Sequence, residues 1–258
     1  MDAVLIAGGI PESGDPLYEF TRGLNKALLD ICGKPMIQWV LDALENAEKA
    51  GKLVIVGLES DSGLVSSKVA RYIASKGDLL ENVRAGILKI LEINPSAERA
   101  LIVSTDIPAI TPQMIDWLVD EAEASAHDVY YNVITRQVME TRYPKSNRSY
   151  VKLKDMEVCG GDMNVLSTKI VTGDEALYAR IVEARKSPFK QASLIGFDNL
   201  LLYLLRAMDL NGAVRRVSKR LNLKGRAILC PYAEIGMDVD KPHQLEILRS
   251  DLENNRVA

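Results

Sequence analysis

Two short stretches decide the fold: "VLIAGG", Val4 to Gly9, and "LIVSTDIP", Leu101 to Pro108. Each is an apolar run, typical of a buried strand, that stops abruptly. The first stops in paired glycines, whereas the second stops in Asp106 and a proline. Because ligands of open α/β sheets bind beyond the carboxyl ends of the strands, the two endings predict one shared ligand-binding edge.

Strand-like and helix-like patterns alternate around these stretches. Short apolar runs predict strands at 3–8, 52–57, 100–105 and 128–134. Apolar residues at helical spacing predict helices at 34–51, 77–93 and 111–125, the last beginning with the capping pair Thr111 and Pro112. This alternation predicts an α/β fold, a Rossmann-like three-layer sandwich with a mostly parallel central sheet.

The pattern changes after about residue 136. Short strands with a hairpin are expected over 148–167, helices over 173–223, a strand at 225–231 and a helix at 240–255. We therefore expect one domain over 1–258, with a core at about 1–136 and 226–258 and a small α+β insertion at about 137–225. The apolar segment 192–210 could line a pocket, belong to the core or form a dimer contact.

Composition limits the possible partners. The formal charge of −3 argues against a dedicated nucleic-acid binder, and 47% hydrophobic with 26% charged residues is ordinary for a globular protein. Three widely spaced cysteines and two histidines disfavour structural zinc and favour a reducing compartment. We see neither a signal-peptide pattern nor an apolar run of the roughly 18 residues that a span needs. We expect a cytoplasmic monomer or homodimer.

Several residues at the predicted edge carry chemistry. Glycines after the first strand let backbone N–H groups approach phosphates, although a tight turn explains them equally well. Asp106 suits Mg²⁺ shared with phosphates, or a simple turn. Asp238 and Asp240 alternate with apolar residues in "GMDVDKP", so on an extended chain both carboxylates face one way. Lys26 follows the glycine loop, where a lysine suits phosphate.

Four motifs, "LIAGG", "RGLNKALLDICGKPMIQWVLDAL", "STDIP" and "DVDKPHQL", resemble in order the nucleotidyltransferases of the molybdenum-cofactor guanylyltransferase type. The resemblance implies a glycosyltransferase-A-like fold and the nucleotide-diphospho-sugar transferase architecture. It also implies Mg²⁺, an NTP and a phosphorylated small-molecule acceptor. The core would bind the nucleotide, and the insertion would lie on the acceptor side.

The resemblance assigns roles by position. Backbone contacts to the nucleotide are implied for Ala7, Gly8 and Gly9, and nucleoside contacts for Gly77 and Asn82. Lys26 would stabilise phosphate charge, with Arg22 in place of the motif's arginine. Mg²⁺ would be bound by Asp106 and Asp240. Acceptor contacts are implied for Gly161, Asp162 and Asn164, although "GGDMNV" also fits a β-turn.

This chain departs from the family pattern near its start. The GxGxRM portion is replaced by the longer, acidic "GIPESGDPLYEFTRGLN", Arg22 lies too near Lys26, and Asn25 stands where proline is usual. The leading hypothesis is transfer of NMP from an NTP to the acceptor with release of pyrophosphate. An ionised acceptor phosphate needs no general base, which agrees with the scarcity of histidine.

Two alternatives remain open at this point. One is a glycosyltransferase that uses a sugar nucleotide, although such enzymes place DxD at the metal and "STDIP" lacks it. The other is a noncatalytic nucleotide-binding regulatory module, which would bind NTP without releasing pyrophosphate. The sequence identifies neither the base nor the acceptor.

Overall fold

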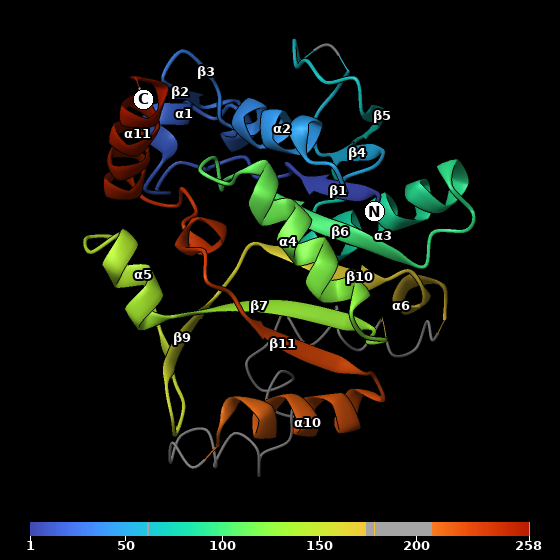
Figure 1. Cartoon of the computed structure of the whole chain (residues 1–258). Helices are drawn as coiled ribbons and strands as arrows, with labels where there is room; N and C mark the ends of the chain where they lie inside the picture. The colour runs from blue at the N-terminus through green and yellow to red at the C-terminus, as the bar shows by residue number, and fades with distance from the viewer. Residues whose placement is uncertain (61, 174–177, 179–207, 258) are drawn as a thin grey trace.

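One nine-stranded sheet forms the centre of the protein (Figure 1). The computed structural model describes residues 1–60, 62–173, 178 and 208–257. The strands lie in the order β5 (Val69–Ile73), β4 (Leu53–Val56), β1 (Ala3–Ile6), β6 (Arg99–Ser104), β10 (Met163–Ser167), β7 (Val129–Thr135), β9 (Glu157–Gly160) and β8 (Val151–Lys152), with β11 (Gly225–Leu229) paired to β7. Within this sheet β9 and β10 oppose the common direction of the other strands, so the predicted mostly parallel sheet is confirmed.

Helices cover both faces of the sheet. The longer ones are α2 (Met36–Asn46), α3 (Leu79–Ile93), α4 (Pro112–Glu123), α10 (Leu210–Leu221) and α11 (Pro242–Val257). Short helical elements are α1 (Tyr18–Thr21), η1 (Lys26–Leu28), α5 (Arg136–Arg142), α6 (Lys169–Thr172) and η2 (Ala233–Gly236). A small hairpin, β2 (Asp30–Ile31) with β3 (Lys34–Pro35), precedes α2.

Alternation along the central strands separates two cores. Leu5 of β1 belongs to the larger core, which includes residues of α2, α4 and α11, whereas its neighbour Val4 packs in the core of α3. In β4, Ile55 and Val54 divide in the same way. Successive strand side chains point to opposite faces, so a continuous apolar run can bury both. The predicted three-layer sandwich is confirmed.

The second half of the chain returns to the same sheet. β10 runs antiparallel between β6 and β7, and β8 and β9 form the predicted hairpin. The division into a core and an insertion stays a prediction, because 174–177 and 179–207 lie outside the described residues. Most of the apolar segment 192–210 lies outside them too.

β5 and α5 are among the elements that the sequence analysis did not predict. β5 is an edge strand that carries Arg71 among half-buried residues, so its apolar signal is weak. α5 is only seven residues long and begins directly after β7. No loop separates the strand from the helix, so the sequence pattern does not mark where the helix begins. Across the described ranges, no helix has the length and apolar character needed to cross a bilayer.

Gly86 allows α3 to approach β1 closely. A Cβ added there would lie 2.2 Å from Cγ1 and 2.9 Å from Cγ2 of Val4, which is fully buried. We expect Gly86→Ala to lower the free energy of unfolding by about 1–3 kcal/mol through overpacking, measured by urea denaturation. The double variant Val4→Ala/Gly86→Ala should lose less than the sum of the single losses. A stabilised Gly86→Ala protein would contradict this close contact.

Candidate active site

The carboxyl ends of β1 and β6 meet, as their sequences predict. The two strands are parallel neighbours with Ile6 opposite Ser104. Just past them, the Thr105 side chain donates a hydrogen bond to the Ile6 carbonyl at 3.0 Å. Asp106 therefore follows directly after the point where the chain is tied to β1.

A cavity of about 260 Å³ opens at this edge. Its lining includes seven residues that the sequence analysis singled out: Ala7, Gly8, Gly9, Lys26, Gly77, Asn82 and Asp106. They come from four separate segments, which only the fold brings together. The glycine backbone, an ammonium and a carboxylate thus surround one space, which is the combination suited to phosphates and a metal.

Gly8 and Gly57 lie in close contact beside the cavity. A Cβ on Gly57 would lie 2.6 Å from the Gly8 backbone, and a Cβ on Gly8 would lie 2.7 Å from the side-chain atom Asn82 Nδ2. Gly57 also has φ of +109°, which favours glycine. The buried Asn82 accepts a 2.6 Å hydrogen bond from the Lys76 N–H, so its side chain orders the loop that contains Gly77. Nucleoside contacts by Gly77 and Asn82 stay a prediction.

Asn25 closes the base of the long loop that replaces the family's motif. Its amide Nδ2 donates to the carbonyls of Ala7, at 2.5 Å, and Gly57, at 3.1 Å. Next to it, the Lys26 N–H donates to the Gly9 carbonyl at 2.8 Å. The chain therefore leaves at Gly9 and returns beside it, which places Lys26 next to the glycines.

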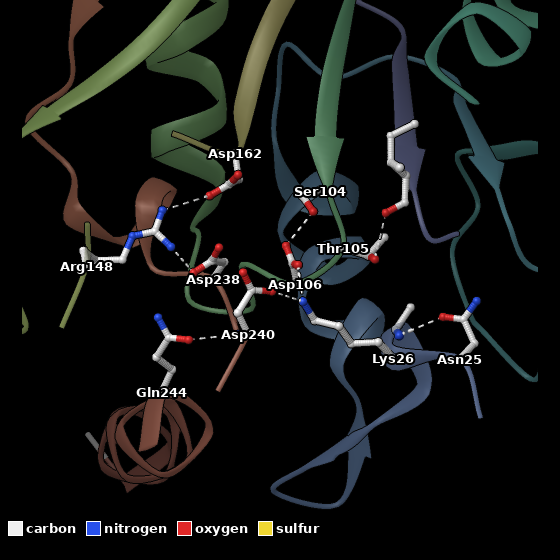
Figure 2. A network of polar contacts seen from close by, with 12 residues as sticks. Asn25, Lys26, Ser104, Thr105, Asp106, Arg148, Asp162, Asp238, Asp240 and Gln244 are labelled. Atoms are coloured by element: carbon white, nitrogen blue, oxygen red, sulfur yellow. Dashed lines mark hydrogen bonds and ion pairs between the residues drawn. The ribbon is translucent and has the colours of Figure 1, made fainter. Parts of the chain in front are cut away.

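Lys26 joins the two predicted metal ligands (Figure 2). Its Nζ lies 2.7 Å from Asp106 Oδ2 and 2.5 Å from Asp240 Oδ1. The Val239 N–H donates to the Asp106 carbonyl at 2.9 Å, which brings the "DVD" segment to the end of β6. The structure thus assembles one lysine with two carboxylates from distant parts of the chain.

The carboxylates determine the charge state of Lys26. Burial by itself lowers the lysine pKa, but attraction to Asp106 and Asp240 outweighs it and raises the pKa above its ordinary value. For Asp240, burial raises the pKa, but Lys26 outweighs this and the net pKa is lowered. At neutral pH this contact is therefore an ion pair.

A second cation, which the sequence analysis missed, lies on the far side of the acidic residues. Arg148 contacts Asp238 through NH1 and lies 3.7 Å from Asp162 Oδ2 through NH2 (Figure 2). Arg148 lies in the segment between α5 and β8 and belongs to no motif, so no sequence signal marks it. The structure also separates the alternating pair: Asp240 binds Lys26, whereas Asp238 binds Arg148.

Burial, together with nearby negative charge, raises the pKa of two carboxyl groups. Burial, reinforced by repulsion from Asp106 and Asp238, raises the pKa of Asp162 to about 8. Burial also raises the pKa of Asp238 to about 6, although Arg148 opposes the change. Four carboxylates face two cations here, so the cluster carries two uncompensated negative charges when all are ionised. Such perturbation is typical of functional sites.

The cluster fits one Mg²⁺ bound together with a nucleotide. One divalent ion would balance the two excess charges, and the buried Asp162 Oδ2 has no hydrogen-bond partner. In the described part of the chain, no three acidic, histidine or cysteine side chains converge as a complete metal cage. Mg²⁺ commonly takes only one or two carboxylates, with phosphates supplying further ligands. Asp106 and Asp240 suit that role.

The remaining predicted residues lie apart from the cavity. Arg22 is exposed at the end of α1 with φ of +49°, and the structure does not bring its side chain into the cavity lining. Gly161 and Asn164 shape the bend between β9 and β10: Asn164 accepts from the Asn132 N–H and donates to the Gly161 carbonyl. Among the acceptor candidates, Asp162 is the one whose side chain reaches the acidic cluster. The binding roles of all four stay predictions.

Comparison with known proteins identifies the family and the fold. Residues 4–224 match the family model for the MobA-like NTP transferase domain. A hypothetical transferase structure from Thermus thermophilus has 31% identity and a TM-score of 0.81, covering 95% of this chain and 98% of that one. The structure of CMP:2-keto-3-deoxy-manno-octonic acid synthetase with CTP, at 13% identity and a TM-score of 0.59, covers 98% and 99% and shares the fold.

Curated relatives cover less of the chain. A probable molybdenum cofactor guanylyltransferase from Thermococcus gammatolerans is 23% identical over 161 residues, 62% of this chain and 75% of that protein. A 3-deoxy-manno-octulosonate cytidylyltransferase from Aliivibrio fischeri is 33% identical over 103 residues, 38% of this chain and 40% of that protein. The chain belongs to the MobA-like NTP transferase family and is an enzyme of the nucleotidyltransferase class.

Asn25 offers a test of the loop closure. Asn25→Ala would leave the Ala7 and Gly57 carbonyls without these donors, and we expect a loss of about 1–3 kcal/mol in the free energy of unfolding. Urea denaturation measures it. The control Asn46→Ala removes a similar 2.7 Å bond to the Asp42 carbonyl at an exposed position and should cost clearly less. Equal losses would show that the half-buried position of Asn25 adds nothing.

Asp162 should make stability depend on pH. Its raised folded-state pKa, about 8 against an ordinary 3.8, means that the folded protein binds more protons than the unfolded chain between these values. Its contribution to the free energy of unfolding therefore falls as pH rises through that window. In metal-free buffer, we expect Asp162→Asn to raise Tm by a few degrees at pH 8 and little at pH 5.

Thermal unfolding with EDTA present measures this effect. The control Asp155→Asn neutralises an exposed carboxylate of the neighbouring segment and should leave Tm similar at both pH values. Equal Tm for wild type and Asp162→Asn at pH 8 would contradict the crowding of charge. Adding Mg²⁺ should reduce the advantage of the variant, since the ion stabilises the ionised wild-type cluster.

Proposed function

We propose that this protein transfers NMP from an NTP to a phosphorylated small molecule, with Mg²⁺ as cofactor and release of pyrophosphate. The observation that carries the proposal is the single cavity in which glycine backbone, Lys26 and Asp106 meet, with Asp240 at its margin on Lys26. Membership of the nucleotidyltransferase class supports the reaction type. What is proposed is that the metal is Mg²⁺ and that the acceptor is a phosphorylated small molecule.

Each group has a role in this reaction. The backbone of Ala7, Gly8 and Gly9 binds the nucleotide where side chains would obstruct it. Lys26 pairs with the phosphate oxygens, whose charge grows as pyrophosphate leaves. Asp106 and Asp240 would hold Mg²⁺, and the bound ion would neutralise and orient the phosphates. An acceptor phosphate is ionised near neutral pH, so positioning and electrostatics suffice for catalysis.

The acceptor approaches from the side opposite the nucleotide. Asp162 and Arg148 lie across the acidic cluster from the glycine cavity and are not part of its lining. An acceptor held there would face the nucleotide across Asp106 and Asp240, which suits in-line attack on the α-phosphorus. We propose Asp162 as an acceptor contact, with Gly161 and Asn164 maintaining the bend that presents it.

The two relatives suggest which nucleotides to try first. One is named a guanylyltransferase and the other a cytidylyltransferase, so GTP and CTP are the leading candidates. The glycosyltransferase alternative predicts binding of sugar nucleotides, and the regulatory-module alternative predicts NTP binding without turnover. The ion pair of Lys26 inside the cavity favours transfer chemistry over both.

A thermal-shift screen tests the proposal. GTP, CTP, ATP and UTP are each added with and without Mg²⁺ to wild type and to Asp106→Ala. One NTP at about 100 times its Kd should stabilise wild type by about 2.7 kcal/mol with Mg²⁺. The variant should lose most of this stabilisation. The exposed Asp155→Ala is the matched control and should respond like wild type.

The outcome directs the next experiment. A shift with one NTP leads to an acceptor search by pyrophosphate release, which separates transfer from mere binding. If no NTP raises Tm and a sugar nucleotide does, the proposal is wrong and the glycosyltransferase hypothesis replaces it.

A further inference from the structure

The Lys26 ammonium lies where a metal ion would be expected. Its nitrogen is 2.7 Å from Asp106 and 2.5 Å from Asp240, the two carboxylates proposed to hold Mg²⁺. A cation at that point contacts both oxygens at once, and Figure 2 shows the ammonium between them. One position therefore serves two different cations, the lysine and the divalent ion.

We propose that Lys26 fills the metal position in the nucleotide-free enzyme and must leave it before a divalent cation binds fully. The inference rests on the metal site of the proposed function. Two cations so close together repel strongly in a partly buried site, where water screens charge poorly. Lys26 and the divalent cation hence compete for the same carboxylate oxygens.

The structure also provides a destination for the displaced side chain. Lys26 lines the glycine cavity as well as contacting the carboxylates. Its backbone is held by the 2.8 Å hydrogen bond to the Gly9 carbonyl and by its neighbour Asn25, so the move needs only side-chain rotation. A lysine has a flexible four-carbon stem and a compact charge suited to phosphate.

The exchange links the two ligands of the enzyme. Phosphates in the cavity attract Lys26 away from Asp106 and Asp240, and the freed carboxylates then accept the divalent cation. The cation and the nucleotide thus favour each other's binding, as linkage requires. Without nucleotide, the lysine protects the site from tight metal binding.

Arg148 stands outside this exchange. It contacts Asp238 and lies near Asp162, but it does not line the nucleotide cavity. Phosphates bound in that cavity would therefore not draw Arg148 away from Asp238. The two cations of the cluster differ in this respect: Lys26 has an alternative position, and Arg148 keeps Asp238 paired.

Binding of Mn²⁺ alone, followed by electron paramagnetic resonance and calorimetry, tests the competition without any turnover. We expect Lys26→Met to bind Mn²⁺ about tenfold more tightly than wild type in the absence of nucleotide. Lys26→Gln keeps a neutral donor for the carboxylates and should show the same direction if the Met variant folds poorly. The control Lys34→Met removes a lysine paired with Asp42 outside the cavity and should bind like wild type.

The same variants are then titrated with Mn²⁺ in the presence of GTP or CTP, whichever stabilises wild type. Here the direction should reverse: Lys26→Met should bind the Mn²⁺–nucleotide pair about tenfold more weakly, because the phosphates lose a charged partner. A variant that is merely misfolded would weaken both titrations.

The outcomes separate the inference from the proposed function. Unchanged or weaker Mn²⁺ binding by both Lys26 variants without nucleotide would overturn the inference, even if an NTP binds and is turned over. Tighter Mn²⁺ binding with no response to any NTP would support the competition at Asp106 and Asp240, while the nucleotidyltransfer proposal would fail.

Discussion

The contact of Lys26 with Asp106 and Asp240 is the interaction on which the rest of the site depends. It joins residues 80 and 214 positions apart in the chain, so it exists only when β1, β6 and the segment before α11 are all in place. The carboxylates repel one another, and the cations that hold them together are themselves costly to bury. Burial raises the pKa of Asp162, and repulsion from Asp106 and Asp238 adds to the shift, so the negative charges of the cluster are not fully balanced. A site with unbalanced charge is poised to take up a cation.

The backbone near the cavity explains how an unusual loop is accommodated. The chain between Gly9 and Asn25 is longer and more acidic than the family pattern, yet it begins and ends at adjacent points. Asn25 supplies side-chain hydrogen bonds that a proline in its place would lack. Because loop-closure entropy grows slowly with length, the extra residues cost little once the base is tied. The loop therefore returns Lys26 to the side of Gly9 in spite of its length.

The acidic cluster also divides the site into two sides. Lys26 gathers Asp106 and Asp240 beside the glycine cavity, whereas Arg148 gathers Asp238 and Asp162 beyond it. This division follows from the bend at Gly161, where the Ser104 N–H donates to the Asp162 carbonyl and brings the β9–β10 turn to the end of β6. Under the proposed function, this division would let the nucleotide bind beside Lys26 and the acceptor beside Arg148.

Local sequence determined the strands of the main sheet except β5, the main helices and the candidate residues of the nucleotide side. Apolar periodicity predicts buried elements, and the glycines, Lys26 and Asp106 follow strand ends at recognisable spacing. Tertiary structure alone decided that Asp238 and Asp240 serve different cations, that Arg148 enters the cluster and that Arg22 lies away from it. It also assigned Asn164 to a backbone bend. These outcomes depend on which distant charges converge, and neither periodicity nor motif spacing encodes the distance between charges in space.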